Sequence, residues 1–236
     1  MSENGEAQQL EDKAAREASE AAQISLRILQ LHVSPIKGKF DVRHQQAIHA
    51  HIFQNFPEHQ PGIIRSDTSH SWIKGRILEG RSNSHRVCYA NKKVAAKIKS
   101  ILKDFGGPQA IEGLPLAISA RQLAGLYGDL DHAHGFYEGN SRTLREFTRE
   151  LAAEAGFRLD WARIGLDATA RNRLYIARDL AVMERAFPGL TAESAMQTTS
   201  RAEYEASFVV ESLRREANGD NLTAIFEMAL HANCPD

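Results

Sequence analysis

The sequence predicts a mainly α-helical protein that carries one small β-hairpin flap. Apolar residues recur at helical spacing along most of the 236 residues, as at Leu123, Leu126 and Leu130. Short apolar pieces set among Ser, Gly, Asn and Arg are confined to residues 63–90, which is typical of one or two β-hairpins. Strand and helix patterns do not alternate, so a parallel α/β sheet is not expected.

Gly and Pro punctuation divides the helical patterns into successive elements. The first pattern covers residues 6–31, of which the second half is expected to pack, and Asp41 is the expected N-cap of a helix through about Asn55. After the flap, we expect Asn91 to cap a basic helix and Ser119 to cap the next one. Later helices are expected at 144–155, 160–164 and 166–186, with two or three more in 190–232.

The composition bears on location and partners. No apolar run approaches the roughly 20 residues of a membrane span, and the polar N-terminus does not resemble a signal peptide. Two cysteines, Cys88 and Cys234, fit a reduced setting better than a disulfide and are not spaced for a zinc site. We therefore expect a cytoplasmic protein with no membrane partner, and the sequence does not indicate an oligomeric state.

Charge is distributed unevenly although the net charge is only −1. Residues 62–103 contain ten Lys and Arg against two acidic residues, whereas residues 146–236 contain fifteen acidic residues against ten Lys and Arg. This pattern indicates either two solvated faces of opposite sign or a basic surface that attracts a nucleotide or an acidic partner. Nucleic-acid binding is not expected, because no recognition-helix pattern is present.

Residues 134–145, HGFYEGNSRTLR, place a loop directly before a helical pattern. The first N–H groups of a helix lack intrahelical partners and the helix dipole is positive there, so such a junction can bind an anion. Gly139 tolerates the positive φ that turns successive N–H groups inward as a nest. Arg142 and Arg145 are three residues apart, so they share one helix face and can reach the same anion.

Two other side chains of this segment could take part in a reaction at the anion site. His134 can take a proton near neutral pH, and Glu138 is a hard oxygen ligand that suits Mg²⁺. Together these groups suit a nucleoside triphosphate, a metal ion and a hydroxyl that must be deprotonated. The alternatives are structural: an ion pair for Arg145, and for His132 simply a polar residue at a helix end.

The segment closely resembles the signature of the Fic family, His-Pro-Phe-x-(Asp/Glu)-Gly-Asn-Gly-Arg-x-x-Arg. The similarity extends to the segments around Pro35–Phe53, Gly62–Arg65 and Leu123–His134. It implies a Fic fold, a helical bundle with a β-hairpin flap over the active site. It further implies a domain over 24–190 (flap 63–90, catalytic motif 134–145), a polar helical extension at 1–23 and a C-terminal helical extension at 191–236.

Most members of that family transfer AMP from ATP to a Ser, Thr or Tyr hydroxyl of a target protein. The resemblance therefore implies a protein adenylyltransferase in which His134 is the general base and Glu138 holds Mg²⁺. It implies that Phe136 packs the loop into the core. The groups implied to hold the phosphates of ATP are Gly139, Asn140, Ser141, Arg142 and Arg145.

Two positions depart from the family signature. Gly135 stands in place of the usual proline, and Ser141 in place of the second glycine. Members with lysine at the latter position bind the nucleotide in a flipped orientation and act as kinases. Serine is small and can join a nest, which favours nucleotidyl transfer. The alternatives are an ATP-binding regulatory module without turnover, and a Fic enzyme that transfers phosphate or another nucleotide.

Many family members are inhibited by a helix with the pattern (Ser/Thr)-x-x-x-Glu-(Gly/Asn), whose glutamate pairs with the second motif arginine, here Arg145. Two segments match in part, Ser207-x-x-x-Glu211 and Ser212-x-x-x-Glu216, each with the wrong residue after it. We therefore expect inhibition by a small separate antitoxin, with self-inhibition by the helix at 200–218 as the alternative. A bacterial toxin or translocated effector is the class of protein that this implies.

Overall fold

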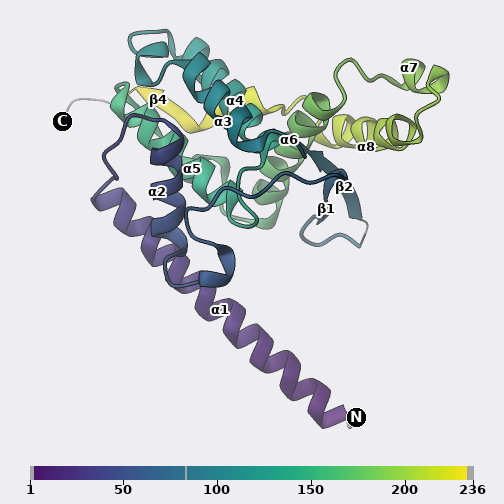
Figure 1. The fold of residues 1–236 in the computed structure, drawn as a ribbon, viewed down its shortest axis with the longest axis horizontal. Helices are drawn as coiled ribbons and strands as arrows, with labels where there is room; N and C mark the ends of the chain where they lie inside the picture. Colours follow the sequence, from purple (N-terminus) through teal and green to yellow (C-terminus); the bar gives the residue numbers. More distant parts are fainter. Residues whose placement is uncertain (1–2, 83, 233–236) are drawn as a thin grey trace.

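A computed structural model describes residues 3–82 and 84–232 of the chain. The fold is mainly helical with small antiparallel sheets, as the sequence predicts (Figure 1). Cys234 lies outside the described residues, and the expectation that it forms no disulfide with Cys88 therefore falls outside them too. No helix within the described ranges combines the length and the apolar character needed to cross a bilayer.

The helices follow one another along the whole chain. In the first half they are α1 (Glu3–Val33), α2 (Val42–Phe53), α3 (Val94–Phe105) and α4 (Leu116–Ala133). In the second half they are α5 (Asn140–Glu154), α6 (Ala168–Ala186), α7 (Ala192–Gln197), α8 (Arg201–Ala217) and α9 (Leu222–Ala229). Short 3₁₀ turns lie at Pro57–His59, Pro108–Ala110 and Trp161–Ile164, the last in place of the helix expected at 160–164.

The expected flap is a single hairpin. Strands β1 (Trp72–Ile77) and β2 (Ser84–Tyr89) pair antiparallel, with Trp72 opposite Tyr89. A second sheet joins β3 (Phe157–Leu159) to β4 (Leu230–Ala232), where the sequence predicted helix through residue 232. That prediction was wrong for β4, because three residues are too few to leave a period-two pattern and their pairing partner lies about seventy positions away.

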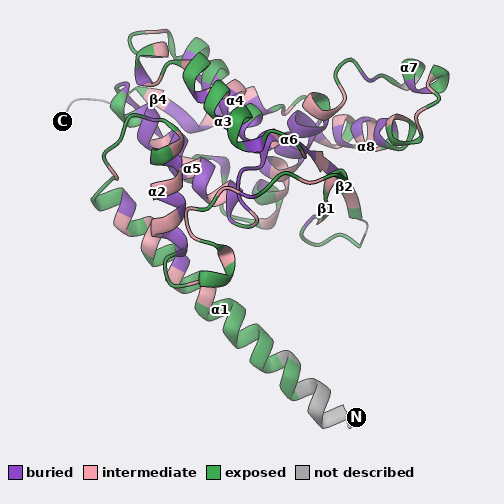
Figure 2. Ribbon diagram, in the orientation of Figure 1, coloured by how far each residue is buried: buried purple, intermediate pink, exposed green. Residues whose placement is uncertain are grey.

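Helix α4 is the centre of the main core. It packs against α3, α5, α6 and α9, and its residues Leu123, Leu126, Tyr127 and Leu130 are buried (Figure 2). A second apolar cluster lies between the hairpin and α6 and α8, and includes Val87, Met183 and Leu213. The chain after residue 190 therefore completes both cores: α9 closes the first and α8 closes the second.

The helix caps correct two of the predictions. Asp41 does cap α2, accepting the N–H of His44 at 3.0 Å. Asn91 does not cap α3; the carboxylate of Asp67 accepts the N–H groups of Lys93 and Val94 at 2.6 and 3.0 Å. That cap comes from a distant segment, which local sequence cannot reveal.

The predicted cap at Ser119 was also wrong. Helix α4 starts at Leu116, directly after Pro115, and Ser119 is a fully buried residue inside its first turn. Pro115 is itself the N-cap residue, and its carbonyl accepts the N–H groups of Ile118 and Ser119 at 2.9 and 3.0 Å, so the first turn closes without a side-chain cap.

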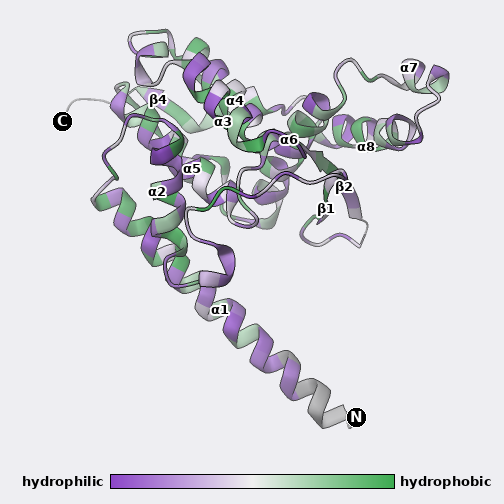
Figure 3. Ribbon diagram, viewed as in Figure 1, coloured by the Kyte–Doolittle hydropathy of each residue, from purple (hydrophilic) through white to green (hydrophobic). Residues whose placement is uncertain are grey.

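Helix α1 divides into two parts. Its N-terminal part extends away from the body and is largely hydrophilic over the described side chains (Figures 1 and 3). Its C-terminal part packs on the core through Ile24 and Leu31, which are 2% and 0% exposed. The expectation that the second half of the 6–31 pattern packs is therefore confirmed.

The place of α9 in the core can be tested at Phe226, whose ring packs against those of Tyr127 and Trp161 with centroids 5.6 and 5.2 Å apart. Phe226→Ala is expected to lower the free energy of unfolding by about 3–5 kcal/mol, because a large buried ring leaves a cavity. Phe208→Ala, at a 60% exposed ring of α8, should change it by about 0.5 kcal/mol or less. Urea denaturation followed by circular dichroism gives both values, and equal losses would contradict this packing.

Candidate active site

His134 ends α4 in a left-handed conformation. Its φ is 50°, and its N–H donates to the carbonyl of Leu130 at 3.1 Å, which closes the last helical turn. The residue is 4% exposed, and its ring packs against that of Tyr89 with centroids 3.9 Å apart. Neither ring nitrogen has a hydrogen-bond partner among the described residues. A buried imidazole in that state needs an explanation, and a reacting partner supplies one.

Arg65 holds the loop after His134 through hydrogen bonds to main-chain carbonyls. Its Nε donates to the carbonyl of His134 at 2.6 Å, and its guanidinium also donates to the carbonyls of Ala133 and Ala90. The backbone N–H of Arg65 donates to the carbonyl of Gly135 at 2.9 Å. These bonds satisfy the carbonyl end of α4 and hold the loop in place although Gly135 replaces the family's proline.

A second brace closes the loop from within. The side-chain amide of Asn140 donates to the carbonyl of Phe136 at 2.6 Å, and its oxygen accepts the N–H of Phe136 at 2.9 Å. Phe136 itself is 1% exposed, which matches its expected role of packing the loop into the core. Asn140 therefore stabilises the loop with its side chain, and its backbone N–H is the group it can offer to an anion.

Gly139 sits at the N-cap of α5 with φ 78°. A Cβ at this position would lie 2.2 Å from the ring of Phe53 on α2, so only glycine fits. In this part of the structure, the first N–H of α5 with a backbone acceptor is that of Thr143, which donates to the carbonyl of Gly139 at 3.0 Å. The preceding N–H groups, at residues 140–142, are thus left for a ligand at the positive end of the helix.

His49 supports the loop from α2. Its ring stacks on that of Phe136 at 3.9 Å, and its Nδ1 accepts the N–H of Gly62 at 2.9 Å. The proton of the neutral ring must then be on Nε2, which donates to the carbonyl of Glu138 at 3.1 Å. Burial lowers the pKa of His49 to about 4, so the ring is neutral and its role is to hold the loop.

Glu138 presents a half-exposed carboxylate beside this loop. One oxygen accepts the N–H of Gly139 at 3.0 Å and lies 3.2 Å from Arg142, and the other lies 3.9 Å from the ammonium of Lys74. Burial opposes ionisation, but the Gly139 hydrogen bond and the two cations outweigh it and lower the pKa of Glu138. The side chain is therefore an ionised carboxylate that can ligate a cation.

This single carboxylate fits Mg²⁺ when phosphate oxygens complete the coordination. Within the described residues, no group of three or more His, Cys, Asp and Glu is placed to hold a metal ion. Mg²⁺ commonly binds through one or two carboxylates together with substrate phosphates and waters. Glu138 beside an anion-binding helix end matches that mode.

The two motif arginines lie on α5 close to the open helix end. Arg142 packs its guanidinium 4.8 Å from the ring centre of Phe53 and pairs with Glu138. The Nε of Arg145 is buried and has no hydrogen-bond partner in the described part of the chain. Ser141, half-buried in the same first turn, adds a small polar group. An unpartnered guanidinium nitrogen at a helix N-terminus is suited to a phosphate group.

The charges around His134 favour its neutral form. Burial lowers the pKa of the imidazole well below 6.5, and nearby Lys74, Arg65 and Arg178 act in the same direction. A general base must be neutral to accept a proton. The site therefore keeps His134 ready to act as a base at neutral pH.

Two residues that shape this site could not be recognised from the sequence. Arg65 is 2% exposed and holds the end of α4. Lys74 projects from β1 and donates to the carbonyl of Tyr137 at 2.9 Å. The only available signal for Lys74 was strand alternation, because residues 72, 74 and 76 share the inward face of the hairpin.

The four residues considered as an inhibitory motif lie elsewhere. Ser207, Glu211, Ser212 and Glu216 belong to α8, which packs on α6 and α7 (Figure 1). Glu216 pairs with Arg81 and accepts the hydroxyl of Ser212, and Glu211 pairs with Arg214. The structure thus gathers residues 134–145 into one site, while the described glutamates of α8 engage partners other than Arg145.

The comparisons with known proteins agree with this geometry. No protein-family model matches the chain. The chain is 34% identical over 158 residues to the protein adenylyltransferase VbhT of Bartonella schoenbuchensis. The matched part is 66% of this chain and 30% of that relative, so the chain spans less than a third of the relative's length.

Solved structures define the fold. The BepC effector of Bartonella tribocorum with bound AMPPNP superimposes with a TM-score of 0.59 at 18% identity, covering 92% of this chain and 87% of that one. The N-terminal Fic domain of a VirB-translocated Bep effector from Bartonella quintana with bound ADP gives 0.56 at 19% identity, covering 92% and 85%. The fold is the Fic fold. This chain is a Fic domain protein, as the motif resemblance implied.

The close approach of α2 to the loop can be tested with two glycines of similar backbone conformation. Gly139→Ala is expected to lower the free energy of unfolding by about 1–3 kcal/mol more than Gly156→Ala. Both positions have positive φ, 78° and 84°, but only the first would press a methyl group into Phe53. Urea denaturation measures both variants, and equal losses would show that Phe53 moves aside freely.

Proposed function

We propose that this protein is a protein adenylyltransferase that transfers AMP from ATP to a Ser, Thr or Tyr hydroxyl of a target protein. The observation that carries the proposal is the buried, unpartnered imidazole of His134 beside the open N-terminus of α5. The adenylyltransferase named above and the nucleotide-bound Bep structures support it by similarity.

The residues divide the work of such a transfer. His134 takes the proton of the target hydroxyl, whose oxygen then attacks the α-phosphorus of ATP. The N–H groups at residues 140–142 and the guanidinium groups of Arg142 and Arg145 stabilise negative charge on the phosphates. Mg²⁺ held by Glu138 would neutralise charge on the leaving pyrophosphate. Positioning and electrostatic stabilisation supply most of the catalysis in phosphoryl chemistry.

The proposal includes the partners and the location. A target would add an extended segment to an edge of the β1–β2 hairpin, which is only two strands wide. A small separate antitoxin would inhibit the enzyme, since Glu211 and Glu216 of α8 already have cationic partners other than Arg145. The enzyme would act in the cytoplasm, either of its own bacterium as a toxin or of another cell as a translocated effector.

The reaction is tested with ATP labelled at the α- or the γ-phosphorus, Mg²⁺ and a bacterial lysate. We expect protein labelling from the α-position alone, and a loss of about 100-fold or more in His134→Ala, because the general base is removed. His132→Ala is the matched control: it stands two residues earlier and lines a groove with Lys97 and Arg185 instead.

The outcomes separate the competing functions. Labelling from the γ-position alone would indicate a kinase, in line with the departure at Ser141. Absence of labelling from both positions, despite measured ATP binding, would indicate a nucleotide-binding module without turnover. Equal activity of the His134→Ala and wild-type proteins would show that the imidazole of His134 is not the general base.

The pH dependence gives a separate check. The base acts in its neutral form, and burial with nearby cations lowers the pKa of His134 well below 6.5. As pH falls, kcat/KM is therefore expected to stay level through 6.5 and to fall only in more acidic solution, because kcat/KM reports groups of the free enzyme. Circular dichroism at each pH controls for unfolding. A half-maximal point at or above 6.5 would contradict the assigned environment.

A further inference from the structure

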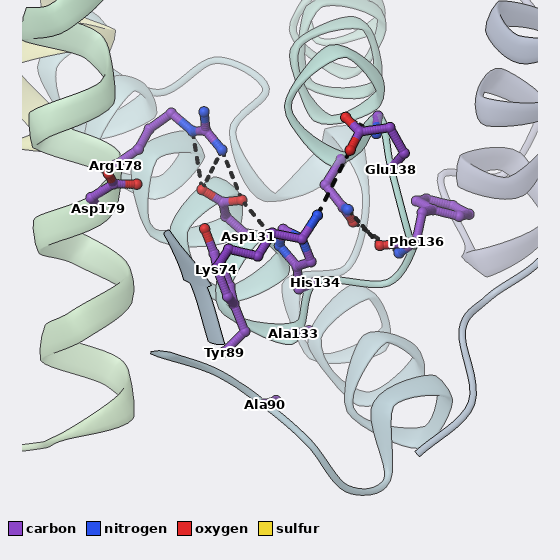
Figure 4. A network of polar contacts seen from close by, with 12 residues as sticks. Lys74, Tyr89, Ala90, Asp131, Ala133, His134, Phe136, Glu138, Arg178 and Asp179 are labelled. Atoms are coloured by element: carbon purple, nitrogen blue, oxygen red, sulfur yellow. Dashed lines mark hydrogen bonds and ion pairs between the residues drawn. The ribbon is translucent and has the colours of Figure 1, made fainter. Parts of the chain in front are cut away.

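A buried carboxylate lies directly behind the imidazole of His134. Asp131, one helical turn earlier on α4, is 1% exposed, and its Oδ1 lies 4.0 Å from Nδ1 of His134 (Figure 4). Arg178 of α6 holds both carboxylate oxygens with three hydrogen bonds of 2.9–3.0 Å. The carboxylate therefore cannot turn away from the ring without breaking a bidentate ion pair.

The ion pair itself is costly for the fold. Asp131 and Arg178 are 1% and 2% exposed, and such a pair is often no more stable than apolar side chains of similar volume. Its place beside the candidate base points to a role other than stability. The evidence for that role is the orientation of the carboxylate, which faces Nδ1 of His134. Nε2, on the other side of the ring, has no hydrogen-bond partner among the described residues.

We infer that Asp131, held by Arg178, is a positioning residue that orients His134 for proton transfer. This inference rests on the proposed adenylyl transfer. The carboxylate accepts the Nδ1–H of the neutral ring, so that the lone pair lies on Nε2, toward the target hydroxyl. The separation of 4.0 Å in the free protein closes when substrates bind, as catalytic hydrogen bonds often do.

The hydroxyl proton moves to Nε2 while the hydroxyl oxygen forms a bond to the α-phosphorus. The bond between that phosphorus and the bridging oxygen breaks, and its electron pair leaves with pyrophosphate. Asp131 stabilises the imidazolium until it releases the proton to water.

The surroundings make this stabilisation necessary. Three cations near His134, those of Lys74, Arg65 and Arg178, disfavour the imidazolium. The neighbouring buried carboxylate, Asp179, is occupied by Arg76 and His85 of the hairpin at 3.0 and 2.8 Å. Asp131 is thus the carboxylate placed to oppose the cations at Nδ1.

One other acceptor belongs to the same residue. The main-chain carbonyl of Asp131 favours the protonated ring, although it does not meet hydrogen-bond geometry with either ring nitrogen. A substitution of the side chain leaves this carbonyl in place, so any effect of the substitution comes from the carboxylate and not from the carbonyl. Asp131→Asn is the informative change, because an amide can donate to Nδ1 and favour the tautomer that has its proton on Nε2.

The first readout is the tautomer of His134, measured by ¹⁵N NMR on histidine-labelled protein and assigned with His134→Ala. We expect the Nδ1–H form in the wild type and a shift toward Nε2–H in Asp131→Asn. In Asp131→Asn the buried Arg178 loses its anionic partner, which can unfold the protein. The double variant Asp131→Asn with Arg178→Gln removes both charges and serves as the second test. Asp179→Asn is the matched control, since it removes an equally buried charge that does not face His134, and it should leave the tautomer unchanged.

The second readout is kinetic. Asp131→Asn should lower kcat about 100-fold or more with little change in the KM for ATP, because orientation of the base matters in the reaction step. An unchanged tautomer in both Asp131 variants, or a kcat loss no larger than that of Asp179→Asn, would overturn the inference. If the wild type transfers nothing from ATP, the proposed function fails while the tautomer still decides the role of Asp131.

Discussion

The end of α4 and the start of α5 meet at the loop after His134, and the site depends on a difference between them: the protein pairs the polar groups of one end and leaves those of the other unpaired. The carbonyl end of α4 is closed by a cation of the protein, Arg65, which is itself buried. The N–H end of α5 is left without a backbone partner, and its nearby guanidinium, Arg145, has an unpartnered nitrogen in the described chain. One dipole is thus satisfied internally and the other is available to an anion. The two hydrogen bonds between the Asn140 side chain and the Phe136 backbone tie the start of α5 to the loop.

Much of this arrangement follows from sequence because its parts are local. The helical spacing of Leu123, Leu126 and Leu130 predicted α4, and the composition of residues 134–145 predicted a loop before a helix. The structure has this loop between the end of α4 and the start of α5 at Asn140, as expected. What the sequence could not show comes from contacts over long separations. Asp67 caps α3 from another segment, β4 pairs with a strand far earlier, and Lys74 reaches the loop from the hairpin.

The buried charges also connect the hairpin to the helical body. Asp179 pairs with Arg76 from β1 and His85 from β2, and the adjacent Arg178 holds Asp131 of α4. Two neighbouring residues of α6 therefore contact both the flap and α4, the helix that leads into the loop. Single-sequence patterns do not reveal such a network, because an arginine and an aspartate side by side on a helix look like a solvated face until burial is known.

The left-handed backbone of His134 has an evolutionary consequence. A non-glycine residue at φ 50° is strained by about 1–3 kcal/mol, and glycine would adopt that conformation more easily. Selection for a robust fold alone would thus replace this histidine and gain thermal tolerance. Under the proposed function, a lineage that lost the reaction should drift toward glycine here, whereas a lineage that keeps the imidazole retains a less stable backbone.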